Sequence, residues 1–137
     1  MATQTYHGSC HCGGVKFEAD IDLSQGAGKC NCSICSKTRN WSISIKPDAF
    51  RLLSGDDAMT DYWFNTNAVH APFCKRCGVR VHGWGDIPEV GGKFVSVRLA
   101  SLDGVSPEVL AAVPIKYSNG RDNDWWHDVT AAEKTYL

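Results

Sequence analysis

The sequence predicts a mostly-β fold built from short strands, and two observations support this prediction. Short segments alternate apolar and polar residues with the period of a half-buried strand, most clearly at 15–19, 41–45 and 94–99. Helical signals are few and brief, at 106–113 and 130–133. Many short strands with few helical segments are typical of an all-β sandwich, barrel or related small fold.

The elements expected in the first half are a strand at 15–19, a connection at 23–29, a short helical turn or loop at 36–40, a strand at 41–45 that ends at Pro47, a strand at 50–53, a turn at 55–57 and a strand at 60–65. Those in the second half are a tight turn at 74–78 closed by glycine, its return strand at 79–84, a hairpin turn at 91–92, a strand at 94–99, a helix at 109–113, a strand at 115–117 and a helical turn at 130–133. Ser106 and Pro107 supply an N-cap and a first-turn proline, and Thr130 with Glu133 matches a capping box.

Length and composition are those of one globular domain covering residues 1–137, with 43% hydrophobic and 21% charged residues. The formal net charge of -1 does not favour a nucleic-acid partner. Residues 1–6 lack a signal-peptide pattern, and no apolar run reaches the length of about 18 residues that a membrane span needs. We therefore expect a cytoplasmic protein with no membrane partner; the sequence leaves the oligomeric state open.

Seven cysteines dominate the chemistry of the chain: Cys10, Cys12, Cys30, Cys32, Cys35, Cys74 and Cys77. Their C-x-C, C-x-C-x-x-C and C-x-x-C spacings are those of metal ligands. A disulfide framework is less favoured, because seven is an odd number and a chain of this length can build a core without staples. A thioredoxin-like role would require one C-x-x-C in a βαβ context, which the sequence lacks.

Seven ligands divide naturally into four and three. A closed structural zinc site takes four protein ligands, whereas an open site takes three and leaves one position for a substrate. We expect Cys10, Cys12, Cys74 and Cys77 to form the closed site, which would pin an early hairpin to a central one. Cys30, Cys32 and Cys35 would form the open one, unless a histidine completes it.

A zinc ion held by three thiolates suits thiol chemistry better than hydrolysis. The set carries one net negative charge, so it should polarise a bound water less well than a set of neutral histidines. A thiol is a soft ligand that ionises when it coordinates. Lys29, Lys37 and Arg39 flank the triplet and offer compensating charge. Lys37 and Arg39 would equally bind substrate carboxylates, or else lie on the solvated surface.

Three motifs together resemble those of the glutathione-dependent formaldehyde-activating family, which is also described through centromere protein V: residues 8–15 (GSCHCGGV), 30–35 (CNCSIC) and 73–78 (FCKRCG). The similarity in order and spacing runs from about Gly8 to Leu102. It implies a zinc-stapled β-tent of short antiparallel strands with few short helices. It also implies a structural zinc on Cys10, Cys12, Cys74 and Cys77, and a catalytic zinc on Cys30, Cys32 and Cys35.

The same resemblance implies a carbon–sulfur lyase that joins formaldehyde and glutathione into S-hydroxymethylglutathione. The expected partners are therefore a small-molecule thiol and an aldehyde, and the triplet zinc is expected to be the more labile of the two. Two alternatives stay open. One is a non-enzymatic zinc-binding interaction module, and the other is a redox or metal-responsive protein in which the triplet loses zinc on oxidation.

Two further groups of residues have functional interpretations that the sequence does not decide between. The five histidines are His7, His11, His70, His82 and His127. We expect His11 to point away from the metal and His70 to be the one nearest a pocket. The run at 124–128 places Trp125, Trp126 and His127 between two acids, either as an aromatic lid on the core or as a wall of the substrate pocket.

Overall fold

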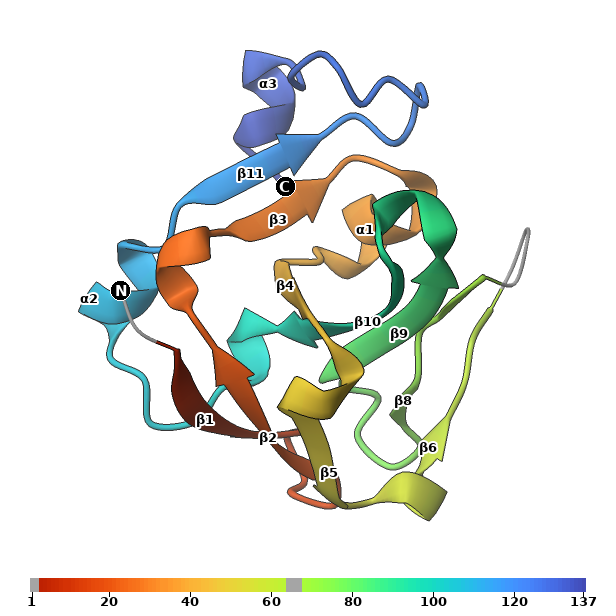
Figure 1. Cartoon of the computed structure of the whole chain (residues 1–137), viewed down its shortest axis with the longest axis vertical. Helices are drawn as coiled ribbons and strands as arrows, with labels where there is room; N and C mark the ends of the chain where they lie inside the picture. Colours follow the sequence, from red (N-terminus) through yellow and green to blue (C-terminus); the bar gives the residue numbers. More distant parts are fainter. Residues whose placement is uncertain (1–2, 64–67) are drawn as a thin grey trace.

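Three β-sheets form the framework of the structure, a computed structural model that describes residues 3–63 and 68–137. Their strand orders are β1-β2-β5, β11-β3-β4-β10-β9-β7 and β6-β8. The strands are β1 Gln4–Ser9, β2 Lys16–Ile21, β3 Ala27–Cys30, β4 Ser42–Ile45, β5 Phe50–Ser54, β6 Met59–Thr60, β7 Val69–His70, β8 Phe73–Cys74, β9 His82–Ile87, β10 Gly92–Arg98 and β11 Ile115–Ser118. In Figure 1 the three-stranded sheet lies at the lower end and β11 with β3 at the upper end, with β4, β10 and β9 between them.

The helices are short, as the sequence predicts. They are α1 Ser33–Thr38, α2 Pro107–Ala111 and α3 Ala131–Lys134, with 3-10 turns at Leu23–Gln25, Pro47–Ala49, Asp56–Ala58, Pro88–Val90 and Leu99–Ser101. Ser106 caps α2, and Thr130 forms the expected capping box with Glu133. In the described part of the chain no helix has the length and apolar character needed to cross a membrane. The mostly-β prediction is confirmed.

The hydrophobic core lies between the three-stranded sheet and the six-stranded sheet. Alternate residues of β2, namely Phe17, Ala19 and Ile21, are almost completely buried, as the period-2 pattern predicts. The Phe17 ring stacks on Phe50 with centroids 5.3 Å apart, and Phe50 stacks on His82 at 4.8 Å. This chain of rings joins β2, β5 and β9, and so connects the two sheets across the core.

Five of the expected strands are present as β2, β4, β5, β10 and β11. The expected strand at 60–65 is wrong over most of its described length, because β6 ends at Thr60 and residues 61–63 have irregular backbone. Residues 64 and 65 lie outside the described part. The return strand expected at 79–84 begins only at His82 and pairs with β10 and β7, not with β8.

Four strands escaped the sequence analysis: the two-residue strands β7 and β8, and the longer strands β1 and β3. In β1 the only buried residue is Gly8, so no apolar alternation marks the strand. The sequence of β3 is Ala-Gly-Lys-Cys, which has no β-branched or aromatic residue. Both strands are defined by their neighbours: β1 pairs with β2 along six residues, and β3 pairs with β11 in parallel, the one departure from the expected antiparallel pairing among the described strands.

The burial of His82 predicts a pH-dependent stability. This side chain is 7% exposed, and burial, helped by the positive charge of Arg98, lowers the pKa of its imidazole from 6.5 to about 4. The unfolded chain therefore binds a proton that the folded chain excludes between about pH 6.5 and 4. The contribution of neutral His82 to the free energy of unfolding is fully present above pH 6.5. It is lost as the pH falls from 6.5 to about 4, which lowers the free energy of unfolding by roughly 3 kcal/mol in total.

Urea denaturation of the wild type and of His82→Phe at about pH 7 and pH 4 measures this contribution. The variant keeps an aromatic ring against Phe50 but cannot titrate, so its free energy of unfolding should fall less on acidification. Protonation of other groups is common to both proteins and cancels in the difference. An identical fall in both would contradict the assignment to His82.

Candidate metal centres

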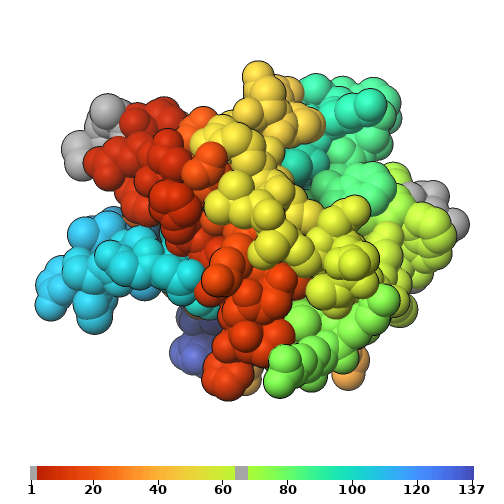
Figure 2. Space-filling view, turned by 90° about the horizontal axis from the view of Figure 1, so that it is seen from below, coloured from red at the N-terminus to blue at the C-terminus, as the bar shows by residue number. Residues whose placement is uncertain are grey.

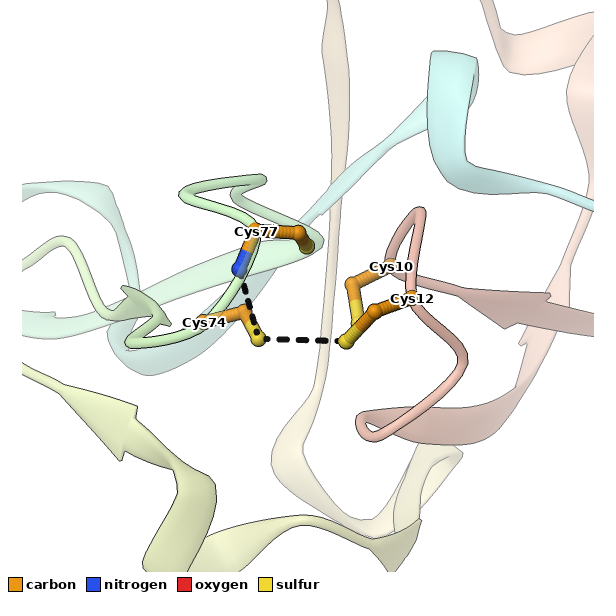
Figure 3. A group of neighbouring side chains, drawn as sticks. All are labelled: Cys10, Cys12, Cys74 and Cys77. Atoms are coloured by element: carbon orange, nitrogen blue, oxygen red, sulfur yellow. Dashed lines mark hydrogen bonds between the residues drawn. The ribbon is translucent and has the colours of Figure 1, made fainter.

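Four cysteine sulfurs from two distant turns converge at one point of the structure. The sulfur atoms of Cys10, Cys12, Cys74 and Cys77 all lie within 4.8 Å of one another. Figure 3 shows Cys10 and Cys12, on the turn after β1, facing Cys74 at the end of β8 and Cys77 on the turn that follows. On the face shown in Figure 2, the N-terminal segment and the segment around residue 77 lie side by side.

Each turn is shaped by hydrogen bonds that aim amide groups at sulfur. The Val15 amide donates to the Cys10 sulfur at 3.3 Å, and the Cys77 amide donates to the Cys74 sulfur at 3.5 Å. Backbone amides of Cys12 and Val79 lower the pKa of the Cys77 thiol to about 6. Hydrogen bonds to the charged form favour it, so this turn is prepared to hold thiolate.

The four sulfurs fit a closed zinc site. Zinc–sulfur bonds of about 2.3 Å in a tetrahedron place the sulfurs about 3.8 Å apart. The Cys12 sulfur lies 3.6 Å from both the Cys10 and the Cys74 sulfur. Cys10 and Cys74 are buried, whereas Cys12 and Cys77 are partly buried. These four residues would hold the ion, as the sequence predicts.

The other three cysteines converge separately, where β3 meets α1. The sulfur atoms of Cys30, Cys32 and Cys35 lie within 4.8 Å of one another, and no other histidine, cysteine or acid of the described residues joins them. Cys30 is the last residue of β3, and Cys32 is the N-cap of α1. The C-x-x-C spacing therefore joins the N-cap to the first helical turn, whose Cys35 amide donates to the Cys32 sulfur at 3.4 Å.

Hydrogen bonds couple the three thiols to one another. The Cys32 sulfur accepts from the Cys30 and Cys35 thiols and from backbone amides, and this lowers the pKa of Cys32 to about 2. The pKa of Cys35 is raised, because its thiol donates to Cys30 and Cys32 and is buried beside them. The Cys35 sulfur also accepts from the Asn40 amide at 3.5 Å. The triplet is thus a compact set of soft donors that fits a three-ligand zinc site.

Asn31, between the first two cysteines of the triplet, is 2% exposed and anchors them to the C-terminal segment. Its side-chain amide donates to Asn119 at 2.9 Å and to Glu133 at 2.6 Å. Its side-chain oxygen accepts from the Arg121 backbone amide, and its backbone oxygen accepts from the Arg121 side chain. Sequence analysis missed this residue, because an asparagine inside a cysteine motif looks like a spacer.

The chain passes close to the triplet at Gly120, where a side chain would not fit. A methyl group at this position would lie 2.8 Å from the Cys30 sulfur, 3.1 Å from Cys32 Cβ and 3.1 Å from the Trp125 ring. Trp125 therefore packs near the triplet. Trp126 is 91% exposed, so the lid-on-the-core interpretation is wrong for this residue. Trp125 is 59% exposed and lines neither cavity described below, so its pocket-wall interpretation stays a prediction.

The cations that flank the triplet have different surroundings. Lys29 donates to the Leu137 backbone oxygen at 2.8 Å, and Arg39 donates to the Tyr136 backbone oxygen at 2.5 Å. These contacts hold the C-terminal end against the triplet. Lys37 lies exposed on the last turn of α1, with no hydrogen bond or ion pair to another described residue.

None of the five histidines joins either cysteine cluster. Four have other partners: His7 pairs with Glu18, His70 with Asp61, His127 with Asp124, and His82 stacks on Phe50. His11 is exposed, in keeping with the prediction that it points away from the metal. The alternative in which a histidine completes the triplet site therefore finds no support among these residues.

One cavity borders the triplet, and a second lies at the end of α1. The first, of about 400 Å³, is lined by Gln25, Gly26, Gly28, Lys29, Cys30, Asn40, Ser42, Ile43, Ser44, Lys116 and Ser118. The second, of about 330 Å³, is lined by Thr38, Arg39, Trp41, Gly78, Val79, Arg80, Arg98 and Ala100. Burial lowers the pKa of Arg98, and the nearby Cys35 sulfur opposes this effect. Sequence analysis found Arg39 but missed Arg80 and Arg98, which only the folded sheets bring to the same place.

The two clusters should differ in their effect on folding. Cys12→Ser or Cys77→Ser should abolish soluble folding, because the four-sulfur site joins turns 62 residues apart and its binding energy is folding energy. Cys32→Ser should leave a folded protein, because the triplet spans one strand end and one helical turn. Soluble yield and circular dichroism measure the difference, and equal loss of folding in all three variants would overturn the division into four and three.

The close approach at Gly120 predicts a selective metal defect. Gly120→Ala should displace the Cys30 sulfur and weaken metal binding at the triplet by roughly 10–100-fold, the range for residues that orient metal ligands. Gly28→Ala is the matched control, because its added methyl group would lie 3.7 Å from its nearest neighbour, an ordinary contact. Metal content after dialysis against a chelator measures the effect. If both variants retain the metal at the triplet equally well, this prediction is wrong.

Comparisons with known proteins agree with the cysteine motifs. The family model described as "Glutathione-dependent formaldehyde-activating enzyme" matches residues 5–116. A Halomonas elongata protein, provisionally named a glutathione-dependent formaldehyde-activating enzyme, is 33% identical over 78 residues, which cover 51% of this chain and 50% of that relative. The crystal structure of a Rhodobacter sphaeroides protein superposes with a TM-score of 0.69 at 29% identity, covering 80% of this chain and 99% of that one. With its family match extending over most of its length, the chain belongs to the glutathione-dependent formaldehyde-activating enzyme family.

Proposed function

We propose that this protein is a zinc-dependent carbon–sulfur lyase that joins a thiol, glutathione or a close relative, to formaldehyde or a related aldehyde. The observation that carries the proposal is the triplet of Cys30, Cys32 and Cys35, which has three converging sulfurs and no fourth ligand among the described residues. The family description names both glutathione and formaldehyde, and this supports the choice of substrates.

The reaction forms one carbon–sulfur bond. The thiol sulfur attacks the carbonyl carbon of the aldehyde, the π electrons move to oxygen, and the proton lost by the thiol ends on that oxygen. Zinc at the triplet would supply an open position at which a thiol binds as thiolate. The product is the S-hydroxymethyl thioether of the starting thiol, and no oxidant or reductant takes part.

The protein's own residues would prepare the site for this step. Cys30 lines the 400 Å³ cavity, so a substrate in that cavity lies beside the triplet. The amides of Cys32 and Cys35 and the side chain of Asn40 donate to the sulfurs and offset their negative charge.

The four-sulfur site would have a different role. Cys10 and Cys74 are buried at 3% and 1% exposure, so this site offers a substrate little access. With four protein ligands it would leave no open position for a thiol. We assign it to stability, where it would hold β1 and β8 together and keep the turns around the core in place.

Cobalt in place of zinc tests the proposal, because its visible absorption depends on the number of sulfur ligands. Titration with glutathione should add one sulfur to one of the two metal sites, or extract that metal, while the spectrum of the other site stays fixed. Proton release should accompany binding, since the thiol must ionise to coordinate. With the zinc protein, S-hydroxymethylglutathione should form faster than in buffer alone.

Cys32→Ser is the control, since it removes one ligand of the triplet and leaves the four-sulfur site intact. Its cobalt spectrum should not respond to glutathione, and adduct formation should proceed at the uncatalysed rate. A wild-type spectrum that is indifferent to every thiol tested, with both sites already saturated by protein ligands, would favour a zinc-binding interaction module instead.

A further inference from the structure

The 330 Å³ cavity beside α1 has a strongly positive wall. Three arginines line it: Arg39 at the end of α1, Arg80 before β9 and Arg98 at the end of β10. No aspartate or glutamate lines the cavity, and within the described part of the chain none of the three arginines forms an ion pair with a carboxylate. Like charges gathered without a counterion repel one another, so this arrangement favours an anion.

Two of these arginines are held in place by the backbone. Arg39 donates to the Tyr136 backbone oxygen, and Arg80 donates to the Ala71 backbone oxygen while its guanidinium lies 5.0 Å from the Phe73 ring centre. A guanidinium fixed in this way loses little further freedom when it meets a ligand. Arg98 differs from both, because no described residue accepts a hydrogen bond from its side chain.

Two buried N–H donors in the cavity wall lack acceptors. They are Nε of Arg98 and Nε1 of Trp41. A buried donor without a partner costs roughly 1–3 kcal/mol, and more when it is charged. The Leu99 amide donates to the Trp41 backbone oxygen at 3.0 Å. Trp41, just before β4, therefore lies beside the end of β10, where Arg98 is. Both donor atoms are enclosed by protein and do not open into the cavity, so a ligand there would meet other atoms of the Arg98 guanidinium.

We propose that this cavity binds a carboxylate group of the thiol substrate, with the Arg98 guanidinium as its principal donor. A carboxylate matches the planar fork of a guanidinium, so Arg98 would hold both of its oxygens. Thr38 and Arg39 line the cavity and lie at the end of α1, the helix that carries Cys35, so the carboxylate subsite would lie beside the triplet. This inference rests on the proposed function for the identity of the ligand, and it assigns the carboxylate contact chiefly to Arg98, where the sequence analysis expected Lys37 and Arg39.

Binding of succinate to the zinc-loaded protein tests the subsite without any thiol. Nuclear magnetic resonance of the five tryptophan indole N–H groups follows it, and Trp41→Phe identifies the signal of Trp41. Succinate should shift this signal saturably, whereas succinamide and sodium chloride at matched ionic strength should not. Arg98→Met should weaken succinate binding by roughly tenfold to a hundredfold, as expected for the loss of a charge-assisted hydrogen bond.

Two further variants control this experiment. Lys93→Met removes one exposed positive charge from the same strand without touching the cavity, and it should bind succinate as the wild type does. Arg98→Lys keeps the charge but loses the planar fork, so it should bind succinate at least several-fold more weakly. If succinate leaves the Trp41 signal unmoved, or if Lys93→Met and Arg98→Met lose binding equally, the proposal is wrong.

A second experiment separates this inference from the proposed function. In the cobalt protein, glutathione should change the absorption spectrum at a concentration at least tenfold lower than the concentration at which its diethyl ester does so. Arg98→Met should remove this difference. If neither thiol changes the spectrum while succinate still shifts the Trp41 indole signal, the lyase proposal is wrong. The cavity is then a carboxylate site whose ligand is not a thiol. If both thiols act at equal concentration in the wild type, the carboxylate subsite fails and the lyase proposal stands.

Discussion

The convergence of four sulfurs from two turns is the constraint on which the rest of this structure depends. Cys12 and Cys74 are 62 residues apart in sequence, yet their sulfur atoms lie 3.6 Å apart. Between them lie β2, β3, α1, β4, β5, β6 and β7, and therefore all three cysteines of the triplet. Closing a loop of this length costs entropy before any contact stabilises it. A metal held by all four sulfurs would offset that cost in one step, because binding energy at such a site is folding energy.

The triplet depends on a second constraint, the packing of the C-terminal segment against it. Asn31 is the centre of this packing, since its buried amide meets Asn119, Glu133 and Arg121 at once. A buried amide with all its partners in place is rigid, and one missing partner would leave a costly unpaired group. The three cysteines are therefore positioned from both sides: by the strand end and helix start that carry them, and by the segment that Asn31 binds.

The sequence was sufficient for the chemistry and for the strands with a buried face, and it was insufficient for contacts between distant segments. Cysteine spacing depends on local geometry, so both clusters could be predicted, and the alternation in β2 directly reflects its burial. The pairing of β3 with β11 has no local signal, because neither side-chain pattern nor turn chemistry encodes it. Gly120, Arg80 and Arg98 were missed for the same reason, since each acquires its neighbours only when remote strands come together.

The part of the chain that shapes the triplet's surroundings is not the part that defines the family. The family model ends at residue 116, whereas Asn119, Gly120, Arg121 and Glu133 all lie beyond it and all contact the triplet or Asn31. The metal ligands, by contrast, fall entirely within the matched region. A change in this segment would therefore reach the metal ligands indirectly, through Gly120 beside the Cys30 sulfur and through the partners of Asn31.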